Sequence, residues 1–233
     1  MRNAQFVAGV IGLLCISASC AAVATPSQWM AGTEFSTGTS YVYLGHVTAL
    51  PGSSLGNGYV KRLWIDWSKY RYDKSGQNYE VSAPGAELAL GFQRASENHW
   101  WAAFAGLTYR HTSLSPADPM SSISGNKINP KWQIEGEQTL GHKWRLSAIG
   151  SYVTGQQGYW TRARVLHDNL PGMQIGLESI AQGDPNYHAN QYGILLLGLK
   201  ANNTVNVGLK AGIRKVAGLN SHTYFGVELG GMY

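Results

Sequence analysis

Hydrophobic and polar residues alternate with a period of two along most of the chain. The clearest example is the last run, residues 223–233, where Phe225, Val227 and Leu229 share one face and Tyr224 and Glu228 share the other. A β-strand separates its side chains in this way, and a helix does not. One face suits lipid, and the other carries a charge and glycines. A strand of this kind that ends on an aromatic residue, here Tyr233, is typical of the closing strand of an outer-membrane β-barrel.

Turn signals divide the chain into alternating runs, which we interpret as strands. The runs are residues 30–37, 40–49, 59–73, 78–94, 99–112, 131–139, 144–154, 159–167, 173–182, 191–200, 204–215 and 223–233. We therefore predict an all-β fold, a single antiparallel transmembrane barrel of about twelve strands. The first two runs are split at residues 37–39, because merging them would give an odd number. Residues 50–58 then form an unusually long turn, so ten strands, or an irregular amino-terminal segment, is the alternative.

The connections also predict an orientation. Both ends of a bacterial outer-membrane barrel lie in the periplasm, where the turns are short, whereas the outer loops are longer. Counted back from the carboxyl terminus, the short connections at 95–99, 140–143, 168–172 and 200–203 fall on the periplasmic side. The longest connection, from Ser113 to Pro130, falls outside.

The same alternation sorts side chains into two faces. We expect Phe225 and Tyr233 to act as membrane-interface and assembly residues. Aliphatic and aromatic positions such as Leu88, Leu90 and Ile194 share the lipid-facing parity. Lumen-lining candidates occupy the alternate positions; they are Arg62, Trp64, Asp66, Glu87, Glu135, Glu137, Arg145, Trp160, Arg162, Arg164, Glu178, Lys210, Arg214 and Glu228. An Arg or Lys facing lipid at the midplane would cost roughly 2–4 kcal/mol, which accounts for this segregation.

The amino terminus predicts export. Residues 1–24 combine a basic start, an apolar run at 6–16 and the small-x-small sequence Ala22-Val-Ala24, which together indicate a Sec-type signal peptide cleaved after Ala24. A lipoprotein cut before Cys20 is the alternative, although the leucine expected three residues earlier is absent. Cleavage after Ala24 removes Cys15 and Cys20, the two cysteines of the chain. The remaining barrel domain, residues 25–233, is then neither a disulfide scaffold nor a thiol enzyme, and we expect it in the outer membrane of a Gram-negative bacterium.

Composition supports this class. The chain has 29 glycines, 11% aromatic residues and only 13% charged residues, as expected for tight turns and interfacial girdles. Its net charge of +5 is not clustered, so nucleic acid is not an expected partner, and outer-membrane lipid is. The histidines lack metal-ligand spacing, and no cofactor or metal is expected.

The inward charges have two interpretations. Acidic and basic groups are nearly balanced, so they can fill the barrel as a structural ion network. Alternatively, Arg162, Arg164 and Lys210 hydrogen-bond a passing solute, while Trp64, Trp160 and Tyr224 offer flat faces to sugar rings. Both interpretations stay open at the level of sequence.

Five segments carry a resemblance to a known family. They are residues 79–94, 114–119, 156–164, 178–187 and 208–215, and in this order and spacing they resemble the cellulose biosynthesis protein BcsS family from about Gly32 to Tyr233. The resemblance implies a barrel-like envelope protein that serves secretion or assembly of cellulose. A cellulose chain and components of a cellulose synthase complex are the partners it implies. The family brings no established catalytic residues, and we predict a non-enzymatic protein.

Two alternative functions are considered beside this one. One is a structural or small-solute, porin-like barrel. The other is an enzyme: His111 and Ser113 lie on one face of a strand, as in the His-x-Ser of outer-membrane lipid A deacylases, where they would act as base and nucleophile. The first glutamate after Ser113 is Glu135, across the long loop, so an orienting Glu nearby is missing.

Overall fold

The computed structural model describes residues 26–118 and 121–232, and these residues form one closed β-barrel. The predicted signal peptide and Tyr233 lie outside the described residues. The strands are β1 Ser27–Ser36, β2 Thr39–Ala49, β3 Asn57–Lys74, β4 Gln77–Ala95, β5 His99–Ser115, β6 Gly125–Leu140, β7 Trp144–Val153, β8 Gly158–Leu170, β9 Met173–Asp184, β10 Tyr187–Lys200, β11 Val205–Val216 and β12 His222–Met232. No helix long and apolar enough to span a membrane occurs in these residues.

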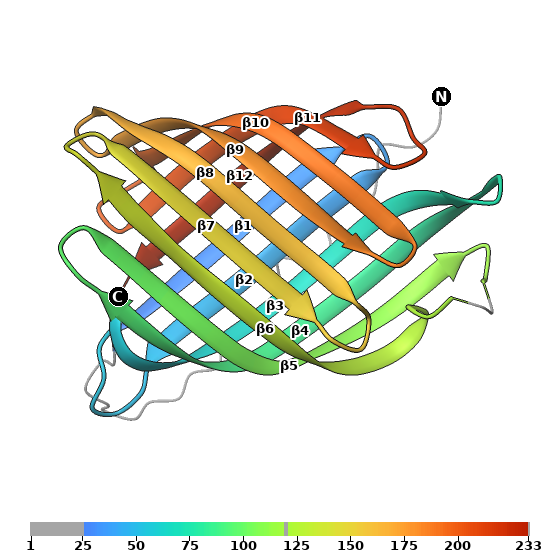
Figure 1. The fold of residues 1–233 in the computed structure, drawn as a ribbon, viewed down its shortest axis with the longest axis horizontal. Coiled ribbons are helices and arrows are strands. Elements are labelled where there is room, and N and C mark those ends of the chain that lie inside the picture. Colours follow the sequence, from blue (N-terminus) through green and yellow to red (C-terminus); the bar gives the residue numbers. More distant parts are fainter. Residues whose placement is uncertain (1–25, 119–120, 233) are drawn as a thin grey trace.

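Each strand pairs antiparallel with its neighbours in sequence, and the first strand closes the sheet against the last. In the closing pair, Gln28 lies opposite Met232 and Ser36 lies opposite Tyr224. Figure 1 shows the strands inclined to the barrel axis, with the β3–β4 hairpin projecting beyond the β1–β2 hairpin. The prediction of an all-β, twelve-stranded antiparallel barrel is confirmed.

The split between the first two strands is also present. β1 ends at Ser36 and β2 begins at Thr39, with Gly38 at a φ of 69°, a conformation that favours glycine in a two-residue turn. The connection between β2 and β3, residues 50–56, is ordered: the amide of Leu50 donates to the carbonyl of Tyr59 at 2.9 Å, and Leu55 packs against the apolar cluster that includes Val60. The long turn expected at 50–58 is therefore present, two residues shorter than expected, and is folded compactly.

The strand bounds differ most from the prediction at one connection. The connection expected from Ser113 to Pro130 is much shorter, because β5 continues to Ser115 and β6 begins at Gly125. The alternation of apolar and polar residues stops where the strands leave the lipid zone, but their hydrogen-bonded ladder continues, with Thr112 opposite Gly125. A pattern based on lipid contact underestimates strands that extend beyond the membrane.

The two ends of the barrel differ. We call the end that holds Ser27 and Met232 the terminal end; the connections at 50–56, 96–98, 141–143, 171–172 and 201–204 share it. The opposite, distal end holds the longest connection, residues 116–124, and the tips of the longest strands. The longest connection therefore lies at the end opposite the termini, as predicted, but the distal end also has two-residue turns at 37–38, 75–76 and 185–186.

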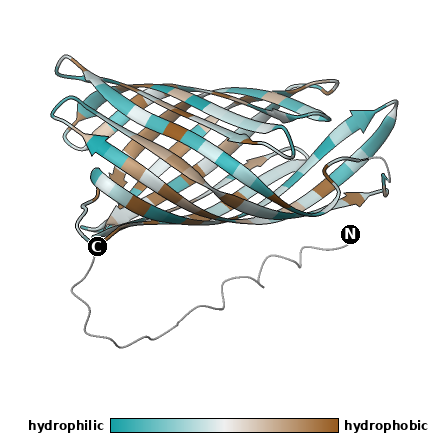
Figure 2. Cartoon of the chain, turned by 60° about the horizontal axis from the view of Figure 1, so that its bottom comes forward, coloured by the Kyte–Doolittle hydropathy of each residue, from teal (hydrophilic) through white to brown (hydrophobic). Residues whose placement is uncertain are grey.

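The outer wall is apolar. Brown and teal positions alternate along the strands in Figure 2, and the exposed positions include many large hydrophobic side chains. Leu90, Leu177 and Ile194 are each more than 60% exposed, which water would penalise and lipid would not. Aromatic residues lie toward the two rims of this belt. Phe35 and Phe225 meet at 5.7 Å between ring centroids, and Tyr59 and Phe92 meet at 5.2 Å.

Inside, several aromatic rings lie against glycines one or two strands away. A Cβ added at Gly193 would stand 2.2 Å from the hydroxyl of Tyr224, and one added at Gly45 would stand 2.4 Å from the indole of Trp64. Glycine is therefore required at these positions to make room for the rings. Rings such as Tyr224 and Trp64 thereby lie along the wall, and charged side chains occupy the middle of the barrel.

Candidate functional site: the barrel interior

Seven charged residues meet in the middle of the barrel, and we call them the central ion network. They are Glu34, Arg162, Arg164, Glu178, Lys210, Arg214 and Glu228. Arg164 holds both Glu178, at 2.5 Å, and Glu228, at 2.6 Å. Glu34 accepts from Lys210 at 2.8 Å and from Arg214 at 3.1 Å. With four cations and three carboxylates, most of the buried charge is neutralised within the network.

The network reaches from wall to wall. Arg164 lies on β8 and Glu228 on β12, and these strands are separated by three others around the barrel. A contact of 2.6 Å between their side chains therefore crosses the lumen and does not run along the sheet. Arg164 is 5% exposed and Glu178 is 3% exposed, so the network is largely removed from solvent.

Two further ion groups lie on the other half of the interior. Glu87 accepts from Nε of Arg62 at 2.9 Å and from Lys131 at 2.6 Å, and the guanidinium of Arg62 lies 4.1 Å from the ring centroid of Phe104. Nearer the distal end, Asp66 accepts from Arg110 at 2.8 Å and 3.0 Å. A buried ion pair that is also hydrogen-bonded holds its strands in register, because removing either partner leaves a charge without compensation.

The distal part of the lumen is crossed by aromatic side chains. Tyr70 and Tyr72 on β3 pack with Tyr187 and Ala189 on β10 and with Val216 on β11, and we call this group the distal tyrosine cluster. The rings of Tyr70 and Tyr187 stand 4.6 Å apart between centroids. Tyr70 also donates to Asp184 on β9 at 3.4 Å, and β3 and β9 lie on opposite sides of the barrel. A ligand cannot lie between the Tyr70 and Tyr187 rings while they are in contact.

The three aromatic side chains considered as sugar-stacking faces already have partners. Trp64 stacks on Tyr43 at 4.7 Å between centroids, with 9° between the ring planes. Trp160 has the guanidinium of Arg162 5.5 Å from its centroid, and Tyr224 is fully buried and donates to Glu178 at 3.3 Å. In this conformation these faces are used for packing within the protein.

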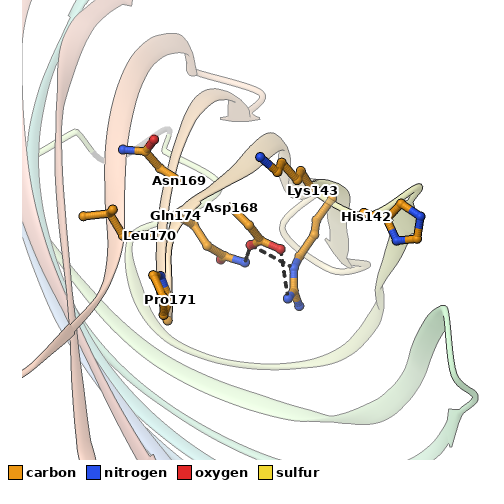
Figure 3. Close-up of a pocket in the computed structure, with 9 residues that line it drawn as sticks. His142, Lys143, Asp168, Asn169, Leu170, Pro171 and Gln174 are labelled. Carbon is orange, nitrogen blue, oxygen red and sulfur yellow. Dashed lines mark hydrogen bonds and ion pairs between the residues drawn. The ribbon is translucent and has the colours of Figure 1, made fainter.

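The remaining predicted residues lie nearer the terminal mouth. Glu135 accepts from Gln133 at 2.7 Å, and Arg145 lies 3.3 Å from Glu137 and 3.4 Å from Asp168. A cavity of about 520 Å³ opens here between the β6–β7 and β8–β9 turns. Figure 3 shows its lining, in which Asp168 is hydrogen-bonded to Gln174 at 2.7 Å. This mouth is polar, whereas the half near β2–β5 is closed by the apolar cluster around Val60 and Leu55.

His111 and Ser113 lie outside the lumen, on the outward face of β5 near the distal end. Oγ of Ser113 lies 3.2 Å from Nε2 of His111, and Nδ1 of His111 lies 2.7 Å from Oδ1 of Asn126 on β6. Glu135, the glutamate considered from sequence, is not part of this group. Asn126 occupies the orienting position that the sequence left unassigned.

Several interior residues were not singled out from sequence. Glu34, Arg110 and Lys131 have the same inward parity as the predicted set, and each completes an ion pair described above. Tyr70 and Tyr187 were missed because period-two alternation shows which face a residue takes and not what it meets across a barrel. Within residues 26–118 and 121–232, no group of three or more His, Cys, Asp or Glu side chains is arranged to hold a metal ion.

Comparisons with known proteins agree with this architecture. The family described as "Cellulose biosynthesis protein BcsS" matches residues 29–231. The KdgM porin superposes with a TM-score of 0.54 at 12% identity, covering 88% of this chain and 99% of the porin. A KdgM porin in complex with disordered oligogalacturonate gives a TM-score of 0.55 with the same identity and coverage. These likenesses show the fold. No curated protein matches the sequence.

Proposed function

Because the chain belongs to the cellulose biosynthesis protein BcsS family, we propose that it serves cellulose biosynthesis as an outer-membrane envelope component whose lumen is closed at rest. The proposed role depends on the position of the barrel in the envelope and on its surfaces. The proposed role does not include continuous passage of a cellulose chain through the lumen.

Two contacts that cross the lumen, at different positions along the barrel axis, support the proposal that the lumen is closed. The Arg164–Glu228 ion pair crosses the middle of the lumen, and the Tyr70–Tyr187 ring contact crosses its distal part. A glucan chain is wider than either contact, so passage would require both to separate. Separating the ion pair would remove the shortest contact of Glu228 and one of the two carboxylates that Arg164 holds, in a site largely removed from solvent.

Single-channel conductance of the full chain in planar bilayers tests this proposal. We expect almost no steady conductance, and no blocking events when cellohexaose is added. The matched variant is Tyr70→Ala combined with Tyr187→Ala, which removes the distal contact; we expect it to open intermittently. A large, stable conductance from the wild-type chain that cellohexaose blocks would contradict the closed barrel.

A second candidate function is an exporter that opens during synthesis. The observation in its favour is that several buried polar atoms of the interior have no protein partner: Nε of Arg162, Nε of Arg214, Oε1 of Gln191 and Nδ2 of Asn129. These groups can hydrogen-bond the hydroxyls of a saccharide. The barrel fold shared with the KdgM porin, which has been solved with an oligogalacturonate, is compatible with such passage.

Trp160 and Arg162 separate the two candidates. An exporter would lose a stacking face and a hydrogen-bond donor in the double variant Trp160→Ala, Arg162→Ala, and extracellular cellulose would fall while synthase activity in isolated inner membranes stayed normal. The envelope component proposed here predicts unchanged extracellular cellulose, provided the variant barrel is present in normal amount. The aromatic contact is worth about 0.5–1.5 kcal/mol beyond burial, enough to affect a moving chain.

A further inference from the structure

A second constellation lies on the outer wall, away from the lumen. Nδ1 of His111 and the hydroxyl of Tyr109 both point to Oδ1 of Asn126, at 2.7 Å and 2.9 Å. An amide oxygen only accepts hydrogen bonds, so Nδ1 of His111 carries the proton in the neutral ring. Nε2 is then the acceptor and receives the hydroxyl proton of Ser113 at 3.2 Å. Ser113, His111 and Asn126 therefore form one hydrogen-bonded chain, in the order nucleophile, base and orienting group.

A comparison within the chain shows that this arrangement is more than a chance serine–histidine contact. Ser96 and His99 in the β4–β5 turn also form a hydrogen bond, at 2.8 Å to Nδ1. There Oγ of Ser96 also lies 3.3 Å from Nε2 of the same ring, so both ring nitrogens face one hydroxyl. In the His111 group the two nitrogens have different partners, which fixes the tautomer needed for a general base.

The His111 group stands at the membrane surface. It continues the outward face of β5 beyond Leu107 and Tyr109, which are 56% and 44% exposed in the lipid belt. In the β4–β5 register Ser113 lies opposite Ser82, which accepts a hydrogen bond from the indole of Trp67 at 3.0 Å. Tryptophans with one polar contact and one apolar face are typical of the interface between hydrocarbon and headgroups. Ester bonds of membrane lipids lie at this height.

Two cations stand beside the group. Lys69 lies opposite Ser82 on β3, so it is two strands, or about 10 Å, from Ser113. Lys69 and Arg71 share the single carboxylate of Glu80, at 2.5 Å and 3.1 Å, and their side chains are 41% and 53% exposed. One positive charge of this trio is left unbalanced at headgroup level. A phosphate attached to a lipid would satisfy it.

From this geometry we propose that Ser113, His111 and Asn126 form an acyl-ester hydrolase site for phosphate-bearing lipids of the outer leaflet. Ser113 Oγ attacks the ester carbonyl while Nε2 of His111 takes its proton. The alcohol leaves with that proton, and the acyl group stays on Ser113. Water, deprotonated by His111, then releases the fatty acid and restores the hydroxyl. Asn126 is a positioning residue, and Lys69 and Arg71 hold the phosphate.

The test uses the full chain folded in detergent, with release of free fatty acid measured by mass spectrometry. Lipid A and phosphatidylglycerol, which carry net negative charge, serve as separate probes to identify which lipid supplies the ester, and phosphatidylcholine, whose phosphate is balanced by choline, is the zwitterionic control. We expect release from at least one of the two anionic lipids, reduced to background in Ser113→Ala. The matched control, Ser96→Ala, should leave release unchanged. No release from either lipid by folded protein would overturn the proposal.

The role of Asn126 has its own readout. Asn126→Leu should lose most of the activity, whereas Asn126→Asp should retain it with an altered pH profile. A carboxylate at this position accepts the same hydrogen bond and favours the charged form of the ring. Since the base acts uncharged, the acid limb of the rate profile should then move to higher pH. An unshifted profile in Asn126→Asp would contradict the assignment of Asn126, even if Ser113→Ala is inactive.

Discussion

Arg164 on β8 and Glu228 on β12 form a two-pronged ion pair across the barrel. Nη1 of Arg164 donates to Oε2 of Glu228 at 3.0 Å, and Nη2 donates to Oε1 at 2.6 Å. The planar fork of arginine matches the two carboxylate oxygens, so this contact fixes direction as well as distance. It ties two strands that share no backbone hydrogen bonds, and it crosses the lumen.

The first prediction concerns the stability of this pair. Glu228→Gln leaves Arg164 with one carboxylate fewer in a buried site and should lower the free energy of unfolding by about 3–5 kcal/mol. The measurement is urea unfolding in detergent, followed by tryptophan fluorescence. Glu137→Gln is the control: its partner Arg145 is 38% exposed, so the loss should be about 0–1 kcal/mol. An equal loss of unfolding free energy in the two variants would show that the central pair stabilises the barrel no more than the exposed pair does.

The second prediction concerns glycines beneath aromatic rings. Gly193→Ala places a methyl group 2.2 Å from the hydroxyl of Tyr224, so the ring must move and the barrel should lose about 1–3 kcal/mol. Gly150→Ala has open space around the added carbon and should be close to neutral. Thermal unfolding of the two variants, compared with wild type, checks the difference. A neutral Gly193→Ala would mean that Tyr224 does not need this contact.

Orientation gives the third prediction. With both termini in the periplasm, a tag inserted between Ser121 and Ser122 lies in the distal connection and should be labelled on intact cells. A tag between Asn202 and Asn203 lies at the terminal end and should be labelled only after the outer membrane is permeabilised. Labelling in the reverse pattern would place the distal end in the periplasm.

The fourth prediction tests the lipid-facing wall. Leu177 is 64% exposed near the middle of the apolar belt, so Leu177→Arg should cost roughly 2–4 kcal/mol and sharply reduce the inserted fraction. Asn202→Arg, in an exposed turn at the terminal end, should insert normally. Insertion is measured as the heat-modifiable band in isolated outer membranes. Normal yield of Leu177→Arg would show that this face does not meet lipid.

Much of the fold could be predicted from sequence because a barrel wall imposes period two on every strand. That pattern, together with the rule that such barrels have an even number of strands, predicted twelve strands, and it predicted inward positions such as Arg164 and Glu228. It could not show that these two residues meet, since the contact depends on the shear and diameter of the closed sheet. The same limit applies to Tyr70 and Tyr187, which are far apart in sequence and on opposite walls.

The strand ends at the outer rim were harder to predict from sequence, for a related reason. Residues 113–130 carry polar side chains and the prolines at 116, 119 and 130, which interrupt the apolar alternation, so this stretch resembles a loop in the sequence. Asn126 lies in this stretch, opposite His111 in the β5–β6 register. Its place beside the His111–Ser113 pair could be seen only once that register was known.

The central claim, a role in cellulose biosynthesis as an envelope component, is tested most directly by deleting the gene in its bacterium under conditions that induce cellulose synthase. Extracellular cellulose is measured in the deletion strain, in the strain complemented with the wild-type chain, and alongside synthase activity in isolated inner membranes. We predict that extracellular cellulose falls on deletion, that synthase activity stays normal, and that the complemented strain recovers. Unchanged extracellular cellulose in the deletion strain would contradict the account.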